Sequence, residues 1–204
     1  MISAPATRAV VFDADPASGT YGQLLGQADL GGAETFMVAF DPNDPTGQRA
    51  YVSMWRDREV VEVDLADPAA PVVARRFATE KNPQGLAFLD ARWMVVANAL
   101  GDSLTVVDRA QSTATSLPID VEEELHGEEP STLAWDPVAS RLYVTLAGAA
   151  AVAAYGVDLA TAPPTISANP ACRSDVPRDR DRGSSHRREE PGDGSCATSP
   201  AATA

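Results

Sequence analysis

A repeat with a period of 47 to 48 residues constrains the fold of this chain more than any other feature of its sequence. Three segments align on an alanine followed by an aromatic residue, at Ala39-Phe40, Ala87-Phe88 and Ala134-Trp135, and these alanines are 48 and 47 residues apart. A fixed spacing of this kind indicates that one structural unit recurs along the chain and buries its core against its neighbours.

Each unit contains three short runs rich in β-forming residues and a fourth, weaker run. The clearest fourth run covers residues 72–77, and its counterpart covers residues 113–117. Turn residues such as Gly101-Asp102 and Asp136-Pro137 separate the runs. Helices are excluded because the runs are too short, too rich in β-branched residues and interrupted by proline and glycine. Four strands per unit at a period in the forties are typical of a β-propeller blade.

The predicted fold class is therefore all-β: a partial β-propeller of about three four-stranded blades plus part of another, with a disordered C-terminal tail. The propeller is assigned to residues 1–165, with a partial unit at about 9–30 and complete units at about 35–82, 83–129 and 130–165. In the partial unit, residues 9–13 match the third strand of a blade and residues 21–30 match the fourth. In the last unit the fourth strand expected after Asp158 is not recognisable.

Residues 166–204 form the predicted tail. Ile166 and Val176 are the only members of the set Val, Ile, Leu, Met, Phe, Trp and Tyr in it, so the segment cannot bury a core. Two interpretations stay open, a natural low-complexity tail and translation out of frame. The second is favoured because the body has a single lysine and many Ala and Arg residues, as a GC-rich gene would give. Both cysteines, Cys172 and Cys196, lie in this segment, which leaves no disulfide framework or thiol nucleophile in the body.

The charge of the chain is concentrated in the predicted propeller. Residues 1–165 carry 10 Lys and Arg against 23 Asp and Glu, a net charge of −13, whereas residues 166–204 are neutral. Such a body repels phosphate backbones, so nucleic-acid binding is not expected. No apolar stretch is long enough to insert into a membrane. The first residues show no signal peptide, so the chain as written is expected in the cytoplasm, or exported if its true N-terminus is missing.

The units resemble the YVTN-type bacterial β-propeller repeat family. The likeness rests on Arg141-Leu142-Tyr143-Val144-Thr145 with Pro130 before it, and on Pro83-Gln84-Gly85-Leu86-Ala87. Residues 63–72 also look like the related LVIVD-type repeat, and the resemblance covers about residues 9–165. The third unit is most similar to the propeller half of proteins that join such a propeller to an alkaline-phosphatase-like domain. The resemblance implies a ring of usually about seven blades, in a protein that is usually exported. It also implies that the metal-binding catalytic half of such a fusion protein, its phosphatase-like domain, is absent from this sequence.

Candidate site residues lie in links that a four-stranded blade places on one face. The candidate ligand-binding residues are Trp55, Arg56, Asn82, Asn98, Asp102 and Glu129. The Trp55-Arg56 pair suits a flat or anionic ligand. Asn98, Asp102 and Glu129 are able to offer oxygen ligands to a cation such as calcium. The alternative is that all six are ordinary turn residues on solvated loops. His126 stands in an acidic run, but neighbours in a loop do not converge and the body has no second histidine.

No catalytic residue, metal site or cofactor is predicted. The sequence has no G-x-S-x-G, Walker A, C-x-x-C or H-E-x-x-H motif. The function favoured is therefore a non-catalytic repeat module that binds an unidentified protein or small ligand. The alternative is the remnant of a propeller hydrolase, lactonase-like or phosphatase-fused, whose catalytic part is missing. An arc that does not close presents unpaired strand edges, which favour self-association.

Overall fold

A computed structural model describes residues 7–119 and 127–175, and fourteen strands account for nearly all the regular structure in that part of the chain. Three antiparallel sheets have four strands each, and one has two. The two-stranded sheet pairs β1 (Arg8–Phe12) with β2 (Leu24–Asp29). The first four-stranded sheet contains β3 (Thr35–Phe40), β4 (Arg49–Met54), β5 (Glu59–Asp64) and β6 (Val72–Ala78). The second contains β7 (Pro83–Phe88), β8 (Trp93–Asn98), β9 (Ser103–Asp108) and β10 (Thr113–Pro118). The third contains β11 (Pro130–Asp136), β12 (Arg141–Leu146), β13 (Ala151–Asp158) and β14 (Thr165–Asp175).

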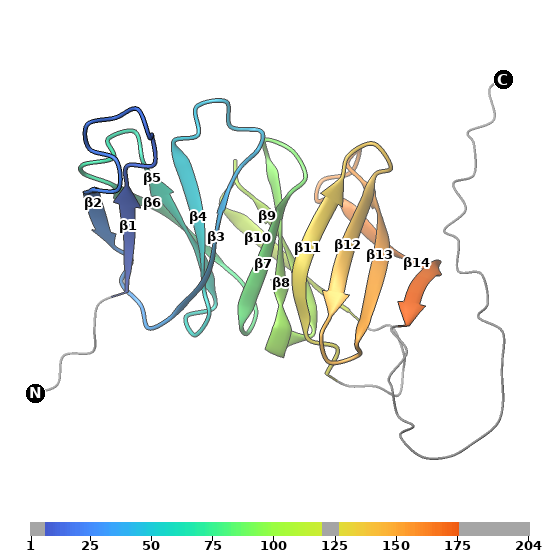
Figure 1. The fold of residues 1–204 in the computed structure, drawn as a ribbon. Coiled ribbons are helices and arrows are strands. Elements are labelled where there is room, and N and C mark those ends of the chain that lie inside the picture. Colours follow the sequence, from blue (N-terminus) through green and yellow to red (C-terminus); the bar gives the residue numbers. More distant parts are fainter. Residues whose placement is uncertain (1–6, 120–126, 176–204) are drawn as a thin grey trace, which may run out of the picture.

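The sheets stand side by side in chain order (Figure 1), with the β1–β2 pair at one end of the row and β11–β14 at the other. Within each complete sheet the strands pair in sequence order, as in a propeller blade. The first strands β3, β7 and β11 are neighbours, and so are the fourth strands β6 and β10. The predicted fold is confirmed: an incomplete β-propeller with three complete blades and part of another.

Burial along the strands follows from the position of each blade in the row. Every residue of β8 and β9, in the middle blade, is buried, because a neighbouring blade covers each face of that sheet. In β12 buried residues alternate with half-buried ones, as expected where only one face is covered. The outer strand β10 is almost wholly exposed.

The core consists of side chains packed between successive sheets. Tyr51, Phe77, Phe88 and Met94 fill the junction between the first two complete blades, where the rings of Tyr51 and Phe88 meet edge to face with centroids 5.1 Å apart. Packing at the next junction brings backbones together at Gly85, where an added Cβ would lie 2.4 Å from the Ser131 carbonyl oxygen. Only glycine allows β7 and β11 to approach this closely.

The last blade differs from the sequence prediction. Residues 166–175 were assigned to the tail, but they continue β14, which pairs with β13 over Thr165–Asp175 and supplies the fourth strand that the sequence did not reveal. The last strand of the blade thus extends past the predicted boundary at 165/166. The strand forms because β13 offers a free edge for pairing, which does not require apolar residues in β14. The rest of the predicted tail, residues 176–204, lies outside the described residues.

In the part of the chain that the structure describes, no helix has the length and apolar character needed to cross a membrane.

Candidate functional site

Three loops from the first two complete blades meet around a cleft of about 430 Å³. The β4–β5 loop contributes Trp55, Arg56 and Arg58, the link from β6 to β7 contributes Lys81 and Asn82, and the short 3-10 turn after β8 contributes Leu100. The structure thus brings together three of the six predicted site residues, Trp55, Arg56 and Asn82. The loops converge because second-to-third and fourth-to-first connections lie on the same face of a propeller blade.

Backbone contacts hold the loops that form this cleft. The backbone N–H of Trp55 donates to the Glu34 carbonyl at 2.8 Å, and that of Thr79 donates to the Arg58 carbonyl at 2.8 Å. Asn82 is buried with a positive φ of 64°, and its carbonyl accepts the N–H of Ala99 at 3.0 Å. The loops are therefore tied to one another and to the ends of the strands, so the side chains they carry are held near each other.

The cleft is cationic in an acidic protein. Arg56 pairs with Glu34 at 2.7 Å, and both side chains are largely exposed. Arg58 and Lys81 form no ion pair with any described residue. The nearby Asp57 carboxylate accepts the N–H of Ala33 at 2.9 Å. Two uncompensated cations beside an indole ring favour an anionic ligand with a planar group.

The other three predicted residues do not join this cleft. Asn98 is fully buried, and its amide nitrogen donates to Thr105 Oγ1 at 2.8 Å and to Ser103. Asp102 and Glu129 meet at the junction between the second and third complete blades, where an Asp102 carboxylate oxygen accepts the N–H of Glu129 at 3.0 Å. The Asp102 carboxylate fixes a loop there, and Asn98 is a core residue.

These three residues do not assemble the oxygen cage suggested for a cation. The described residues contain no group of three or more His, Cys, Asp or Glu side chains placed to hold a metal ion. His126 and the acidic residues 122–124 lie outside the described residues, so the interpretation of that run stays a prediction.

A second cluster of charges lies at the opposite ends of the strands, and its cations are paired. Glu62 is fully buried between Arg49 and Arg75, with oxygen–nitrogen distances of 2.6 Å to each. Arg109 is also buried; it donates to Asp41 at 2.6 Å and to the Tyr51 hydroxyl at 3.0 Å. Burial raises the pKa of Tyr51, against the opposing effect of Arg109. Because each cation has an acidic partner, this cluster joins blades and offers little charge to a ligand.

Sequence reasoning placed Arg58, Lys81 and Leu100 on the same face but did not select them. Two features together distinguish Arg58 and Lys81: they line the cleft and, among the described residues, they have no acidic partner. Both features depend on side-chain geometry. Lys81 also carries a signal visible in the sequence, because it is the only lysine of the chain.

Comparison with known proteins shows what the fold resembles. No protein-family model matches the chain, and no curated protein matches it. Solved structures do. A protein from Lactobacillus plantarum matches 80% of the chain with a TM-score of 0.63 and 13% identity. A protein of unknown function from Desulfotomaculum acetoxidans matches 82% with a TM-score of 0.60 and 13% identity. A putative 6-phosphogluconolactonase from Bacteroides fragilis matches 77% with a TM-score of 0.56 and 16% identity.

The chain spans about half the length of these structures, covering 49%, 48% and 46% of them respectively. At such low identities the likeness is one of fold, and it does not transfer a site. Taken with the sheet order, the likeness supports the β-propeller fold.

Proposed function

We propose that this chain is a YVTN-type propeller repeat module that binds an anionic ligand with a planar apolar group in the cleft around Trp55. The observation that carries the proposal is the pair of cations, Arg58 and Lys81, that have no acidic partner among the described residues. Elsewhere in the described body, Arg49, Arg75, Arg76, Arg92 and Arg109 pair with carboxylates. A cationic site in a chain of net charge −13 selects anions at short range, since the rest of the surface repels them.

The ligand class follows from the lining of the cleft. Arg58 and Lys81 supply donors for a carboxylate or phosphate, and an arginine fork binds such groups in two-point fashion. Trp55 and the largely exposed Leu100 supply an apolar surface for a ring. The ligand expected is therefore an aryl or heterocyclic carboxylate or phosphate ester, bound without chemical change.

Calorimetric titration with phenyl phosphate tests this proposal, with phenol and inorganic phosphate as partial ligands. We expect phenyl phosphate to bind more tightly than either part. Arg58→Gln and Lys81→Gln should each weaken binding by about tenfold, or ~1.4 kcal/mol. Arg8→Gln is the matched control, since Arg8 lies on β1 and donates to Gln27 at 3.2 Å. Equal affinity in the cleft variants and the control contradicts the proposal.

A remnant of a propeller hydrolase is the second candidate. It is favoured by the likeness to proteins named putative 6-phosphogluconolactonases, since a phosphorylated lactone is also an anion. The test is proton release from a phosphorylated δ-lactone at constant pH. Hydrolysis above the buffer rate that falls in Lys81→Gln would favour the hydrolase, and binding without hydrolysis would favour the module.

A further inference from the structure

Among the described residues, the cleft around Trp55 is lined by cations and by no carboxylate. In the β4–β5 loop, Arg56 and Arg58 line the cleft, whereas Asp57 between them does not. The Asp57 carboxylate instead accepts the Ala33 N–H at 2.9 Å, in the link between β2 and β3. The cleft therefore gathers the cations of this loop without its anion.

Two of the three lining cations keep their full charge for a ligand. Arg56 is held by Glu34, through its Nε at 2.7 Å, so its charge is compensated. Arg58 and Lys81 are exposed and have no acidic partner among the described residues. Lys81 lines the cleft, and its sequence neighbour Glu80 does not. The cleft thus presents two uncompensated positive charges.

Asn82 adds a neutral donor beside these cations. It lines the cleft although it is only 6% exposed. Its Oδ1 accepts a hydrogen bond from the Gln84 side-chain amide at 2.8 Å, which assigns the orientation of the Asn82 amide. The Asn82 Nδ2 group donates to no described residue. A largely buried donor of this kind gains most from a bound acceptor, because leaving it unpaired costs free energy.

The Trp55 indole contributes an apolar surface to the cleft. Its Nε1 is buried and has no hydrogen-bond partner in the described part of the chain, so the ring presents carbon atoms to a ligand. Leu100, which is 62% exposed, adds to this apolar surface. Polar recognition therefore depends on Arg58, Lys81 and Asn82.

We propose that the cleft selects a phosphomonoester dianion, an inference that rests on the proposed function of the cleft as a site for aromatic anions. The two negative charges match the two uncompensated cations. The three terminal phosphoryl oxygens match the three donor groups, which belong to Arg58, Lys81 and Asn82. A carboxylate has one charge and two oxygens, so it leaves one cation and one donor without a partner. A cleft of about 430 Å³ suits a small aromatic phosphate.

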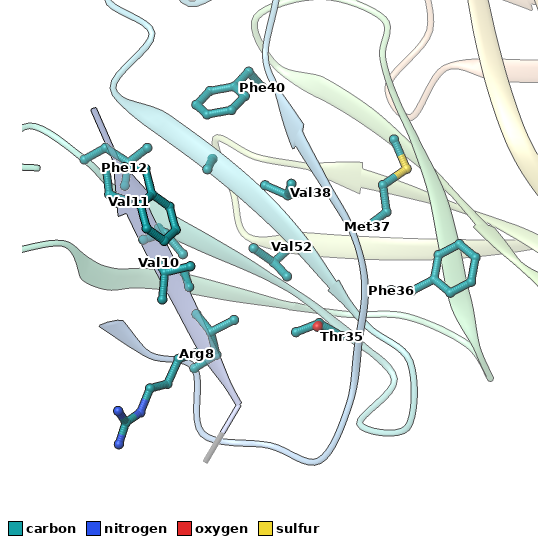
Figure 2. A pocket seen from close by; sticks show the side chains of 15 residues that line it. Arg8, Val10, Val11, Phe12, Thr35, Phe36, Met37, Val38, Phe40 and Val52 are labelled. Atoms are coloured by element: carbon teal, nitrogen blue, oxygen red, sulfur yellow. The ribbon is translucent and has the colours of Figure 1, made fainter. Parts of the chain in front are cut away.

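A second pocket, between β1 and β3, provides a contrast within the same molecule (Figure 2). Its volume is similar, about 440 Å³, but Arg8 is the only charged residue among the described residues that line it. The Arg8 guanidinium donates to Gln27 at 3.2 Å, and in Figure 2 it points away from the labelled apolar side chains. This pocket has no pair of cations that would select a dianion, so Arg8→Gln is the matched control.

Ligands that differ in one property at a time test the selection. Phenyl phosphate is a dianion at about pH 8, because its second pKa is about 6. Phenyl sulfate keeps the three terminal oxygens and has one negative charge, and benzoate has one charge and two oxygens. We expect calorimetry to show that phenyl phosphate binds at least about tenfold more tightly than phenyl sulfate, and that benzoate binds most weakly.

Variants of the lining residues test the source of the preference. In Arg58→Gln and in Lys81→Gln, the preference for phosphate over sulfate should fall to about threefold or less, because one uncompensated cation remains. Arg8→Gln should keep the full preference. Asn82→Asp retains an acceptor for Gln84 but replaces the donor with a negative charge, so it should weaken binding of both ligands at least about tenfold. Thermal melting checks that this variant folds; the two variants at exposed cations test the proposal without it.

The outcomes separate this inference from the proposed function. Equal affinity of the wild type for phenyl phosphate and phenyl sulfate overturns the inference and leaves the proposed function standing, because both ligands are aromatic anions. A preference that persists unchanged in Arg58→Gln and in Lys81→Gln also overturns it, because the cations of the cleft would not be its source. Failure of all three ligands to bind overturns the proposed function itself.

Discussion

Glu62 is a residue whose charge is wholly withdrawn from water. Its two carboxylate oxygens contact Arg49 and Arg75 at 2.6 Å each. Arg75 also donates to the Arg109 carbonyl, across the junction with the middle blade. Removing one charge of a buried network leaves the others without compensation, which costs more free energy than the intact network contributes.

We expect Glu62→Gln to lower the free energy of unfolding by about 3 kcal/mol. Glu34→Gln, which removes the partner of Arg56 in an exposed ion pair, should lower it by less than about 1 kcal/mol. Urea denaturation of both variants makes the comparison. Equal losses would show that the burial of Glu62 has no energetic consequence.

Acid stability should depend on Asp108. Hydrogen bonding to Arg92 holds the pKa of Asp108 below its ordinary value. Because the folded-state pKa is below the unfolded value of about 3.9, the unfolded chain binds more protons between the two values. Stability therefore rises with pH there: the contribution of Asp108 is present above about pH 4 and is lost as the pH falls through the lowered pKa.

Thermal unfolding of wild type and Asp108→Asn between about pH 2.5 and 6 tests this assignment. The variant should melt at a lower temperature at pH 6, and the difference should shrink as the pH falls below about 4. A difference that stays constant over the whole range would mean that the carboxylate charge contributes nothing.

At the scale of strands and loops, the elements most accessible to sequence reasoning were those with repeated apolar patterns. The run at residues 72–77 predicted β6, and the run at 113–117 predicted β10, each within a residue or so of its observed ends. β14 was missed because its sequence, Thr-Ile-Ser-Ala-Asn-Pro-Ala-Cys-Arg-Ser-Asp, lacks apolar alternation. Its formation depends on β13, and a local pattern does not report the presence of a partner.

For the candidate site, the sequence predicted which loops lie together but not where their side chains point. Loop topology is set by strand order, so Trp55 and Asn82 were correctly placed on one face. The direction of a side chain within its loop is set by contacts, so the burial of Asn98 was not foreseen. The sequence also gives no sign of the positive φ angles of Arg58, Asp102 and Ala150, which recur just before the third strand of each complete blade. Glycine is the residue usually expected there.

Gly85 offers a test of how closely the elements pack. We expect Gly85→Ala to lower the free energy of unfolding by about 1–3 kcal/mol, because the new Cβ meets the backbone of β11. Gly19→Ala is the control, since nothing lies within 4 Å of its added Cβ; it should be neutral or slightly stabilising. Chemical denaturation measures both variants. A tolerated alanine at Gly85 would mean that β7 and β11 separate readily.

The described strands form a row in which the main contacts of each blade are with its neighbours. The middle blade has neighbours on both faces, and the blades at the ends have fewer. Because the stability of such a row is close to a sum of unit and junction contributions, the middle blade should be the last to open.

Native-state hydrogen exchange tests this order. Amides of β8 and β9 should exchange most slowly, and those of β1, β2 and β12 faster, since opening from either end exposes them first. Uniform protection across all four sheets would instead indicate that the row unfolds as one cooperative unit.

The unlike ends of the row give the molecule a direction. One end presents β1, which pairs with β2 alone among the described strands, and the other presents the outer face of a complete blade. Two copies that meet through the same end are related by a twofold axis and form a dimer, whereas copies that meet through unlike ends are arranged head to tail. A head-to-tail arrangement closes into a ring only if the rotations between successive copies add up to a full turn. Otherwise it extends into a filament. A polymer built from head-to-tail contacts of this chain is therefore expected to be polar.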